Sequence, residues 1–338
     1  MTPEQDGLTH NPRPEFWRRG RRILFGRPGH VRRPLIFLIL IGLAASLSSG
    51  SFLTVRNISA LLTSTSFLVV ASVGEAFVVM VGMIDLGVES LLAASGMLLA
   101  WLFVMRGVAG AAAIVATLAG GTLTGCLVGV LVARGRIPSF IVTLGTYWGL
   151  RGVALLFNGG NYISPDTATP PRPFSFDWIA GGFHGVPTLI LIAFAVVLVG
   201  QGAMSFTPAG AWIRATGSNE DAARAVGLRT DLVKLSVLAV SGFAAAMAGI
   251  MITTWQDSVY PLTGQGYSLE AIAAVILGGI PFTGGRGTIV GAALGALVIG
   301  VINDVIVLIG LPALYEYIFV ACILVLAGLQ ARAAVAAK

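Results

Sequence analysis

Long apolar runs, separated by short polar or Gly/Pro-rich breaks, dominate the pattern of this sequence. A helix needs about 20 mostly apolar residues to cross roughly 30 Å of hydrocarbon, and several runs approach or exceed that length. The predicted membrane segments are 34–50, 58–83, 89–105, 108–133, 137–157, 187–206, 234–255, 266–281, 287–309 and 312–328. The pattern therefore predicts an all-α integral membrane protein with about ten transmembrane helices.

The first apolar run has an alternative interpretation as a secretory signal, because Ala44, Ala45 and Ser46 near its end are small. A polar stretch of 33 residues precedes the run, which is longer than the basic segment of a signal peptide. We therefore expect this run to be retained as the first span. The expected organisation is a basic cytoplasmic tail (1–33), a transmembrane domain (34–328) and a short cytoplasmic tail (329–338).

Composition supports a membrane environment, since 56% of residues are hydrophobic, 11% are charged and the mean hydropathy is +0.89. Soluble domains carry about 25% charged residues. The 44 glycines favour close helix packing in lipid, where burial alone drives no association. Two small-residue stripes predict helix contact faces, within one chain or between two: Gly121, Gly125, Gly129 and Gly287, Gly291, Gly295.

The net charge of +6 does not indicate nucleic acid, because the basic residues cluster at the ends of apolar segments. Cytoplasmic loops of membrane proteins carry an excess of Lys and Arg. With the N-terminus inside, 17 of the 21 basic residues are cytoplasmic and the rest are Arg56, Arg106, Arg151 and Arg172. This distribution predicts that both termini are cytoplasmic.

The longest predicted outside loop spans 158–187 and is rich in proline. It carries Phe174, Phe176 and Trp178. Two interpretations stay open: the loop contacts a partner, or it joins two spans and its aromatic residues anchor the membrane interface.

The cytoplasmic loop 207–233 contains local signals for a short helix of about two turns. Ser218 and Asp221 fit a capping box, acidic side chains favour the helix start, and Gly227 suits a left-handed stop. A helix this short is marginal alone in water, so it either packs on its own bundle or enters a groove on a cytoplasmic subunit. The predicted coupling-helix residues are Gly217, Ser218, Asn219, Glu220, Asp221, Ala222, Ala223, Arg224 and Gly227. The small Ala222 and Ala223 are expected to allow close approach of that subunit.

Two apolar segments are interrupted by Gly, Pro or acids, at 81–89 and at 277–287. Transporters build discontinuous helices beside a polar path from such segments. The alternative is that both are simple cytoplasmic turns.

No motif for an enzyme is present. The Gly-rich stretch 284–288 lacks the Lys of a phosphate loop, so this chain has no ATPase motif of that kind. The cysteines (Cys126, Cys322) and histidines (His10, His30, His184) form neither a disulfide framework nor a metal-site spacing. A membrane enzyme or a channel with a repeated pore ring is therefore not indicated.

Ionisable residues inside apolar segments are the remaining functional candidates, since placing one near the bilayer centre costs about 2.5–3.5 kcal/mol on insertion scales. The candidates for a translocation path are Glu75, Asp85, Glu89, Thr143, Arg151 and Glu270. A buried structural pair or a bond to nearby backbone explains Glu75 and Arg151 equally well. Asp304 and Glu316 are expected at the membrane interface.

Several stretches form a recognisable set: 82–89 (GMIDLGVE), 138–145 (PSFIVTLG) with Arg151-Gly152, 217–224 (GSNEDAAR) with Gly227, Ser241-Gly242, Ala248-Gly249, 271–279 (AIAAVILGG) and 284–287 (GGRG). Through them the sequence resembles, over most of residues 35–328, the permeases of binding-protein-dependent ABC importers of the ribose and xylose type. Met83, Gly87 and Glu89 replace small or hydroxyl residues common in that family, and Ser268 with Glu270 stand where Glu and Asp are frequent.

The resemblance implies a division of labour in the inner (plasma) membrane. Two permease chains, identical or different, form the path, cytoplasmic ATPases bind the short helix, and a periplasmic solute-binding protein delivers a monosaccharide or a related polar solute. No cofactor is implied for the permease. The alternative is an ion-coupled secondary transporter, in which a midplane acid such as Glu75 couples proton or sodium movement without an ATPase.

Overall fold

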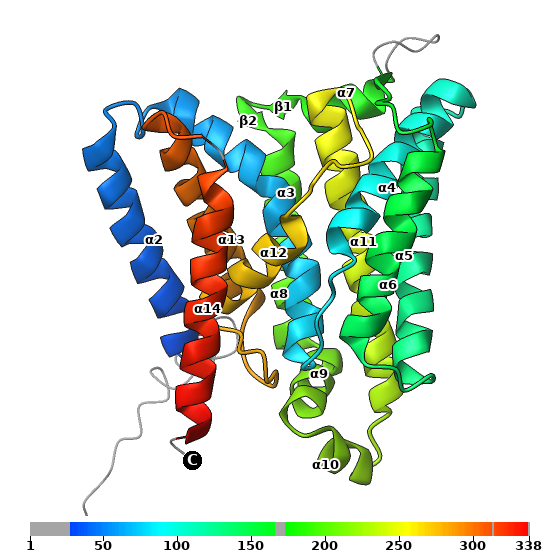
Figure 1. Cartoon of the computed structure of the whole chain (residues 1–338), viewed down its shortest axis with the longest axis vertical. Helices are drawn as coiled ribbons and strands as arrows, with labels where there is room; N and C mark the ends of the chain where they lie inside the picture. The colour runs from blue at the N-terminus through cyan, green and yellow to red at the C-terminus, as the bar shows by residue number, and fades with distance from the viewer. Residues whose placement is uncertain (1–27, 166–172, 313, 337–338) are drawn as a thin grey trace, which may run out of the picture.

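The computed structural model describes residues 28–165, 173–312 and 314–336. The described chain is almost entirely helical (Figure 1). Its elements are α2 (Pro28–Ser48), α3 (Val55–Met80), α4 (Val88–Ala100) with a π-helical turn (Trp101–Met105), α5 (Gly110–Ala133), α6 (Ser139–Leu156), α7 (Phe174–Ala180), β1 (Gly182–Phe183), β2 (Val186–Pro187), α8 (Thr188–Phe206), α9 (Pro208–Ser218), α10 (Glu220–Ala225), α11 (Thr230–Gln256), α12 (Tyr267–Leu277), α13 (Ile289–Leu308) and α14 (Tyr315–Ala336). The predicted all-α class is confirmed.

A helix overlaps each predicted membrane segment, but the helices differ in length. Among the described residues, seven helices are long and apolar enough to cross a membrane: Val55–Met80, Val88–Met105, Gly110–Ala133, Ser139–Leu156, Thr188–Phe206, Thr230–Gln256 and Ile289–Leu308. Three shorter apolar helices are Pro34–Ser48, Tyr267–Leu277 and Tyr315–Leu326. Ten crossings therefore stay a prediction.

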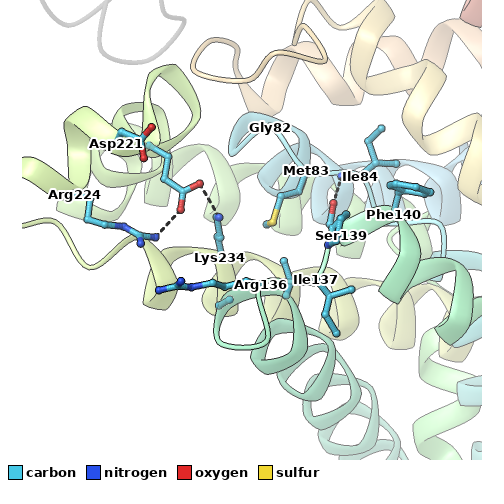
Figure 2. A pocket seen from close by; sticks show the side chains of 14 residues that line it. Gly82, Met83, Ile84, Arg136, Ile137, Ser139, Phe140, Asp221, Arg224 and Lys234 are labelled. Carbon is cyan, nitrogen blue, oxygen red and sulfur yellow. Dashed lines mark hydrogen bonds and ion pairs between the residues drawn. The ribbon is translucent and has the colours of Figure 1, made fainter.

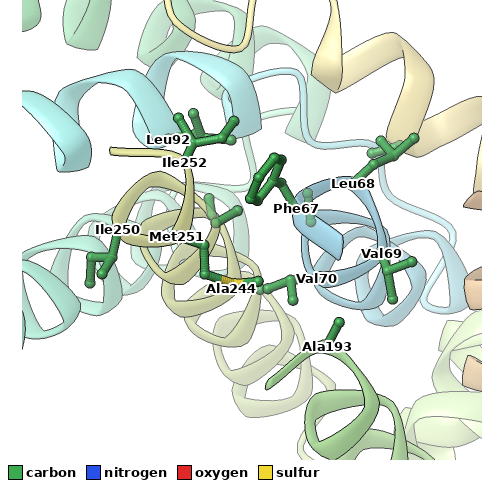
Figure 3. Packing of buried hydrophobic residues seen from close by; sticks show 14 of the residues in the cluster. Phe67, Leu68, Val69, Val70, Leu92, Ala193, Ala244, Ile250, Met251 and Ile252 are labelled. Carbon is green, nitrogen blue, oxygen red and sulfur yellow. The ribbon is translucent and has the colours of Figure 1, made fainter. Parts of the chain in front are cut away.

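The core of the bundle lies between α3 and α11, where α4 and α8 also pack. Figure 3 shows Phe67 and Val70 of α3 beside Ala244 and Met251 of α11, with Leu92 of α4 close by. The α3 window that could span a membrane is 89% buried inside the protein, whereas that of α6 is 22% buried. Side chains of α6 such as Trp148 and Leu156 are exposed, so this helix lies at the edge of the bundle.

The predicted small-residue stripes are helix contacts within one chain. A Cβ added to Gly129 of α5 would lie 2.8 Å from the Leu235 Cα of α11. A Cβ on Gly295 of α13 would lie 2.8 Å from the Ala274 carbonyl carbon of α12. These helices approach closely because no side chain separates their backbones.

Two irregular stretches, residues 81–87 and 278–288, interrupt the helices. The first returns into the bundle, because the Asp85 N–H reaches the carboxylate of Glu75, which lies five residues before the end of α3. At 1.5 Å per residue this is a return of about 7.5 Å. The second follows α12, whose 11 residues are too few to cross hydrocarbon. A polar path beside these stretches stays a prediction.

The connection between α6 and α8 folds over one end of the molecule. Residues 166–172 of this connection, with Arg172, lie outside the described residues, as do the tail 1–27 and Lys338. Phe176 of α7 is buried against Phe103, with ring centroids 5.1 Å apart, whereas Phe174 and Trp178 are exposed. Ile163 pairs with Val259, which ties the loop to the end of α11.

At the opposite end, α9 and α10 project below the bundle (Figure 1). The predicted capping box is wrong in detail: Asn219, not Ser218, caps α10, and its side chain accepts a 2.9 Å bond from the Ala222 N–H. Ser218 is instead the last residue of α9, a helix that the sequence analysis did not predict. The expected left-handed stop is confirmed, since Gly227 has φ of 86°.

Candidate functional site

The six predicted path residues gather around the irregular stretch 81–87, which we call the acidic segment. Its backbone is bound by side chains of the neighbouring helices. The Ile84 N–H donates to the Ser139 hydroxyl (3.3 Å), and the Thr143 hydroxyl donates to the Ile84 carbonyl (3.3 Å). Both partners belong to α6, so α6 fixes the position of this segment.

Glu75 and Asp85 form a buried pair of acids within the bundle. Asp85 Oδ2 accepts a bond from the Ser241 hydroxyl (2.8 Å), and Asp85 Oδ1 accepts one from the Gly87 N–H (2.9 Å). Glu75 Oε1 accepts from the Asp85 N–H (3.2 Å), whereas its Oε2 has no hydrogen-bond partner among the described residues. Ser241 lies near the middle of the 27-residue α11, so these acids are deep in the protein rather than at its rim.

Glu89 joins the starts of two helices. It lies in the first turn of α4, and its Oε2 accepts a 2.8 Å bond from the N–H of Gly266, the residue that precedes α12. The Ser268 hydroxyl accepts from the Glu89 N–H (3.0 Å) and donates to the Leu86 carbonyl (3.0 Å). Helix N-termini carry partial positive charge, so this carboxylate is stabilised from both sides.

Arg151 completes this junction. Its guanidinium lies 2.9 Å from Glu89 Oε1, and both side chains are more than 90% buried. The same side chain donates to the Pro261 carbonyl. Arg151 therefore makes both of the structural contacts considered for it, a buried pair and a bond to backbone, and its role in a path stays a prediction. A buried pair of this kind is costly to break, because removing one partner leaves the other uncompensated.

Glu270 lies one turn into α12 and is 3% exposed. Its Oε1 has no hydrogen-bond partner among the described residues. A Cβ on Gly266 would lie 3.4 Å from this oxygen, so Glu270 borders the junction. The structure thus brings Glu75 next to Asp85 and Glu89 next to Arg151, with Thr143 and Glu270 flanking them.

The sequence analysis missed the hydroxyl groups that bind the acids. Ser241 and Ser268 appeared there as parts of motifs, without a role. Ser139, Ser241 and Ser268 are all small polar residues inside or beside apolar helices, where their hydroxyls must find partners. This need for a hydrogen-bond partner is the signal by which the three serines could have been identified from the sequence.

The predicted coupling helix α10 is held by charged side chains. The Glu220 carboxylate lies 2.9 Å from Arg224 and 2.7 Å from Lys234 of α11. Burial by itself raises the pKa of Glu220, but the hydrogen bond and charge of Lys234, with Thr230 and Arg224, lower it below its ordinary value. At neutral pH the carboxylate is therefore charged and ties α10 to α11.

The exposed face of α10 differs from the one expected. Ala223 is 5% exposed and packs on its own chain, so it is unavailable to a partner. Ala222, Ala225 and Val226 are exposed, Val226 at 85%. These three residues form the accessible apolar surface of α10.

A pocket of about 570 Å³ separates α10 from the acidic segment (Figure 2). Its lining includes Met83 and Ile84, Ser139 and Phe140 of α6, and the charged residues Arg136, Glu220, Asp221, Arg224 and Lys234. The predicted coupling helix and the acidic segment therefore share a cavity.

Comparison with known proteins gives matches over most of the chain. A family model described as the permease component of a branched-chain amino acid transport system matches residues 57–328. The ribose import permease protein RbsC of Escherichia coli strain K12 is 36% identical over 294 residues, which cover 87% of this chain and 90% of that protein. No solved structure matches.

Two further relatives carry other solutes in their names. The L-arabinose ABC transporter permease protein AraH of Azospirillum brasilense is 34% identical over 309 residues, covering 90% of this chain and 87% of that protein. The autoinducer 2 import system permease protein LsrC of Escherichia coli is 33% identical over 279 residues, covering 82% and 80%. The similarity therefore extends to permeases of several import systems.

Proposed function

This chain belongs to the family of permease components whose model matches residues 57–328. We propose that it is the membrane-spanning subunit of an ABC importer for a monosaccharide or a related polar solute. The observation that carries this proposal is the similarity, over at least four fifths of each chain, to permeases named for ribose, L-arabinose and autoinducer 2. The ion-coupled alternative is not favoured, because these relatives are permeases of import systems.

The proposed topology places the protein in the inner membrane with ten membrane segments and with both ends of the chain in the cytoplasm. The asymmetry of basic residues supports it. Figure 1 also shows α2 beginning and α14 ending at the end of the bundle where α9 and α10 lie. In this arrangement α12 and residues 278–288 together complete one crossing, with 1–33 and 329–338 as cytoplasmic tails.

We propose that α10 docks on a cytoplasmic ATPase subunit. Its six residues are too few for a stable isolated helix, and it projects from the bundle. The exposed apolar residues Ala222, Ala225 and Val226 suit insertion into a groove of that partner. The loop 207–233 is thus the coupling loop.

The solute path is proposed to run beside the acidic segment, between this chain and a second permease chain of the same or a different sequence. Glu75, Asp85, Glu89, Thr143, Arg151 and Glu270 are each less than 10% exposed. Their role in this proposal is to hold the segment that borders the path. A periplasmic solute-binding protein would deliver the solute to the opposite end, where Phe174 and Trp178 are exposed.

The docking proposal is tested with Ala222→Trp in the assembled importer. Bulk at this exposed position should leave the permease folded but reduce ATPase co-purification and solute-stimulated ATP hydrolysis by at least tenfold. Ala222→Ser, which keeps the residue small, is the matched control and should behave as the unaltered chain. Normal ATPase recovery and normal uptake with Ala222→Trp would contradict docking through this face.

A further inference from the structure

Three backbone stretches, far apart in sequence, meet directly above α10. They are the end of α3 (residues 80–82), residues 284–285, and the end of α9 (residues 217–218). The Gly285 N–H donates a 2.8 Å bond to the Met80 carbonyl. We call this meeting point the glycine node.

The node is built from backbone on backbone, because glycines occupy its contact positions. A Cβ on Gly217 would overlap the Met80 carbonyl oxygen and would lie 2.6 Å from the Gly285 nitrogen. A Cβ on Gly284 would lie 2.7 Å from the Gly82 nitrogen. With no side chain between them, the three stretches have little room to move independently.

The node lies between α10 and both irregular stretches. Ser218, in the node, is followed directly by Asn219, the cap of α10. Gly82, in the node, belongs to the acidic segment, which leads to Asp85 and then to Glu89. Residues 284–285 lie within 278–288, which connects α12 to α13. A displacement of α10 therefore reaches both stretches at one point.

The helices that adjoin the two stretches, α4 and α12, are also joined at their N-termini. Glu89, at the start of α4, binds the Gly266 N–H at the start of α12. The acidic segment is thus connected to α12 and residues 278–288 at two points, the node and the Glu89 junction. Because of these two connections, the acidic segment, α12 and residues 278–288 move together more readily than independently.

A second route from α10 exists through its ion pairs with α11. These pairs differ in exposure: Arg224 and Asp231 are 50% and 55% exposed, whereas Lys234 and Glu220 are 19% and 32% exposed. Exposed ion pairs contribute little and yield easily. The backbone contacts of the node are the stiffer connection.

We propose that Gly217, Gly284 and Gly285 are positioning residues for coupling: their node transmits the movement of the docked α10 to both irregular stretches at once. This inference rests on the proposed function, since it assumes that an ATPase moves α10. It assigns a part in transport to glycine residues that lie outside α10.

The test is Gly217→Ala in the complete importer, with permease, ATPase and solute-binding protein in nanodiscs or proteoliposomes. Gly217 lies in a helix without positive φ, so alanine is acceptable locally and the change acts through the node. We expect normal ATPase co-purification, at least a tenfold loss of solute-stimulated ATP hydrolysis, and an equal loss of uptake. Gly202→Ala, on α8 with open space around its Cβ, is the matched control and should leave all three unchanged.

Retention of normal stimulated hydrolysis and uptake by Gly217→Ala would overturn the proposal. Should this variant fail to assemble, hydrogen–deuterium exchange on the unaltered importer decides. Adding a non-hydrolysable ATP analogue should change exchange in 80–87 and in 278–288 together. A change of hydrogen–deuterium exchange in the coupling loop without a change in both stretches would also overturn the proposal. If the unaltered importer shows no ATP-dependent uptake at all, the proposed function fails instead.

Discussion

The two irregular stretches both connect helices within the bundle, yet different interactions hold them. Residues 81–87 are bound mainly by side-chain oxygens, including Glu75, Ser139 and Ser241. Residues 278–288 are held mainly by close backbone contacts, of Gly278 with Gly291 of α13 and of Gly284 with Gly82 of the first stretch. Hydrogen bonds to side chains can lengthen or exchange partners, whereas backbone contacts either fit or clash. The comparison indicates that added side-chain bulk is tolerated less in 278–288 than in 81–87.

The largest effect is expected at Gly278, where the glycine stretch leaves α12. Its φ of −66° suits any residue, but a Cβ would lie 2.6 Å from the Ala292 nitrogen. Gly278→Ala should therefore force the α12 and α13 backbones apart, which costs more than the roughly 1–3 kcal/mol of ordinary side-chain overpacking. Size-exclusion chromatography in detergent should show severe loss of monodisperse protein, whereas Gly202→Ala should elute normally. A normal yield for Gly278→Ala would remove the distinction between the two stretches.

An effect of similar or smaller size is expected at the Glu89–Arg151 pair. Arg151→Met leaves Glu89 buried without its counter-charge and should destabilise the protein by about 3–5 kcal/mol. Adding Glu89→Gln should recover part of that loss, because no unpaired charge then remains. Thermal unfolding of the single and double variants measures the coupling. Strictly additive losses would mean that the pair does not hold the junction.

A smaller effect is expected at Glu75, and two substitutions there separate shape from charge. Glu75→Gln keeps an acceptor for the Asp85 N–H, so uptake should stay within about threefold of normal. Glu75→Ala leaves that N–H unsatisfied, a cost of about 1–3 kcal/mol, and should reduce uptake about tenfold without loss of membrane insertion. If glutamine is as damaging as alanine, the carboxyl charge itself is needed, which would favour ion coupling.

Much of this architecture could be predicted from hydropathy, because apolar length largely determines where membrane helices lie. Helix α9 was missed, since Trp212 and Arg214 interrupt its apolar pattern and no membrane-length run marks it. The cap of α10 moved by one residue because Ser218 and Asn219 are both good caps, and only the end of α9 decides between them.

The candidate site was harder to predict than the helices. Glu89 and Arg151 were singled out individually for being ionisable in apolar surroundings, but their pairing across 62 residues has no sequence period. The burial of Ala223 likewise depends on how α10 packs against its own bundle, which neighbouring residues do not reveal. The Glu89–Arg151 pairing and the burial of Ala223 both depend on tertiary contacts, which the spacing of residues along the sequence does not reveal.

The central claim, that the chain moves solute only as part of an ATP-driven importer, is tested most directly by uptake into proteoliposomes. The measurement uses labelled ribose, L-arabinose and autoinducer 2, each with the ATPase and solute-binding protein of the same import system. Accumulation of at least one solute should require ATP, the ATPase and the binding protein together. Accumulation by the permease alone, driven by an imposed proton or sodium gradient, would contradict the account.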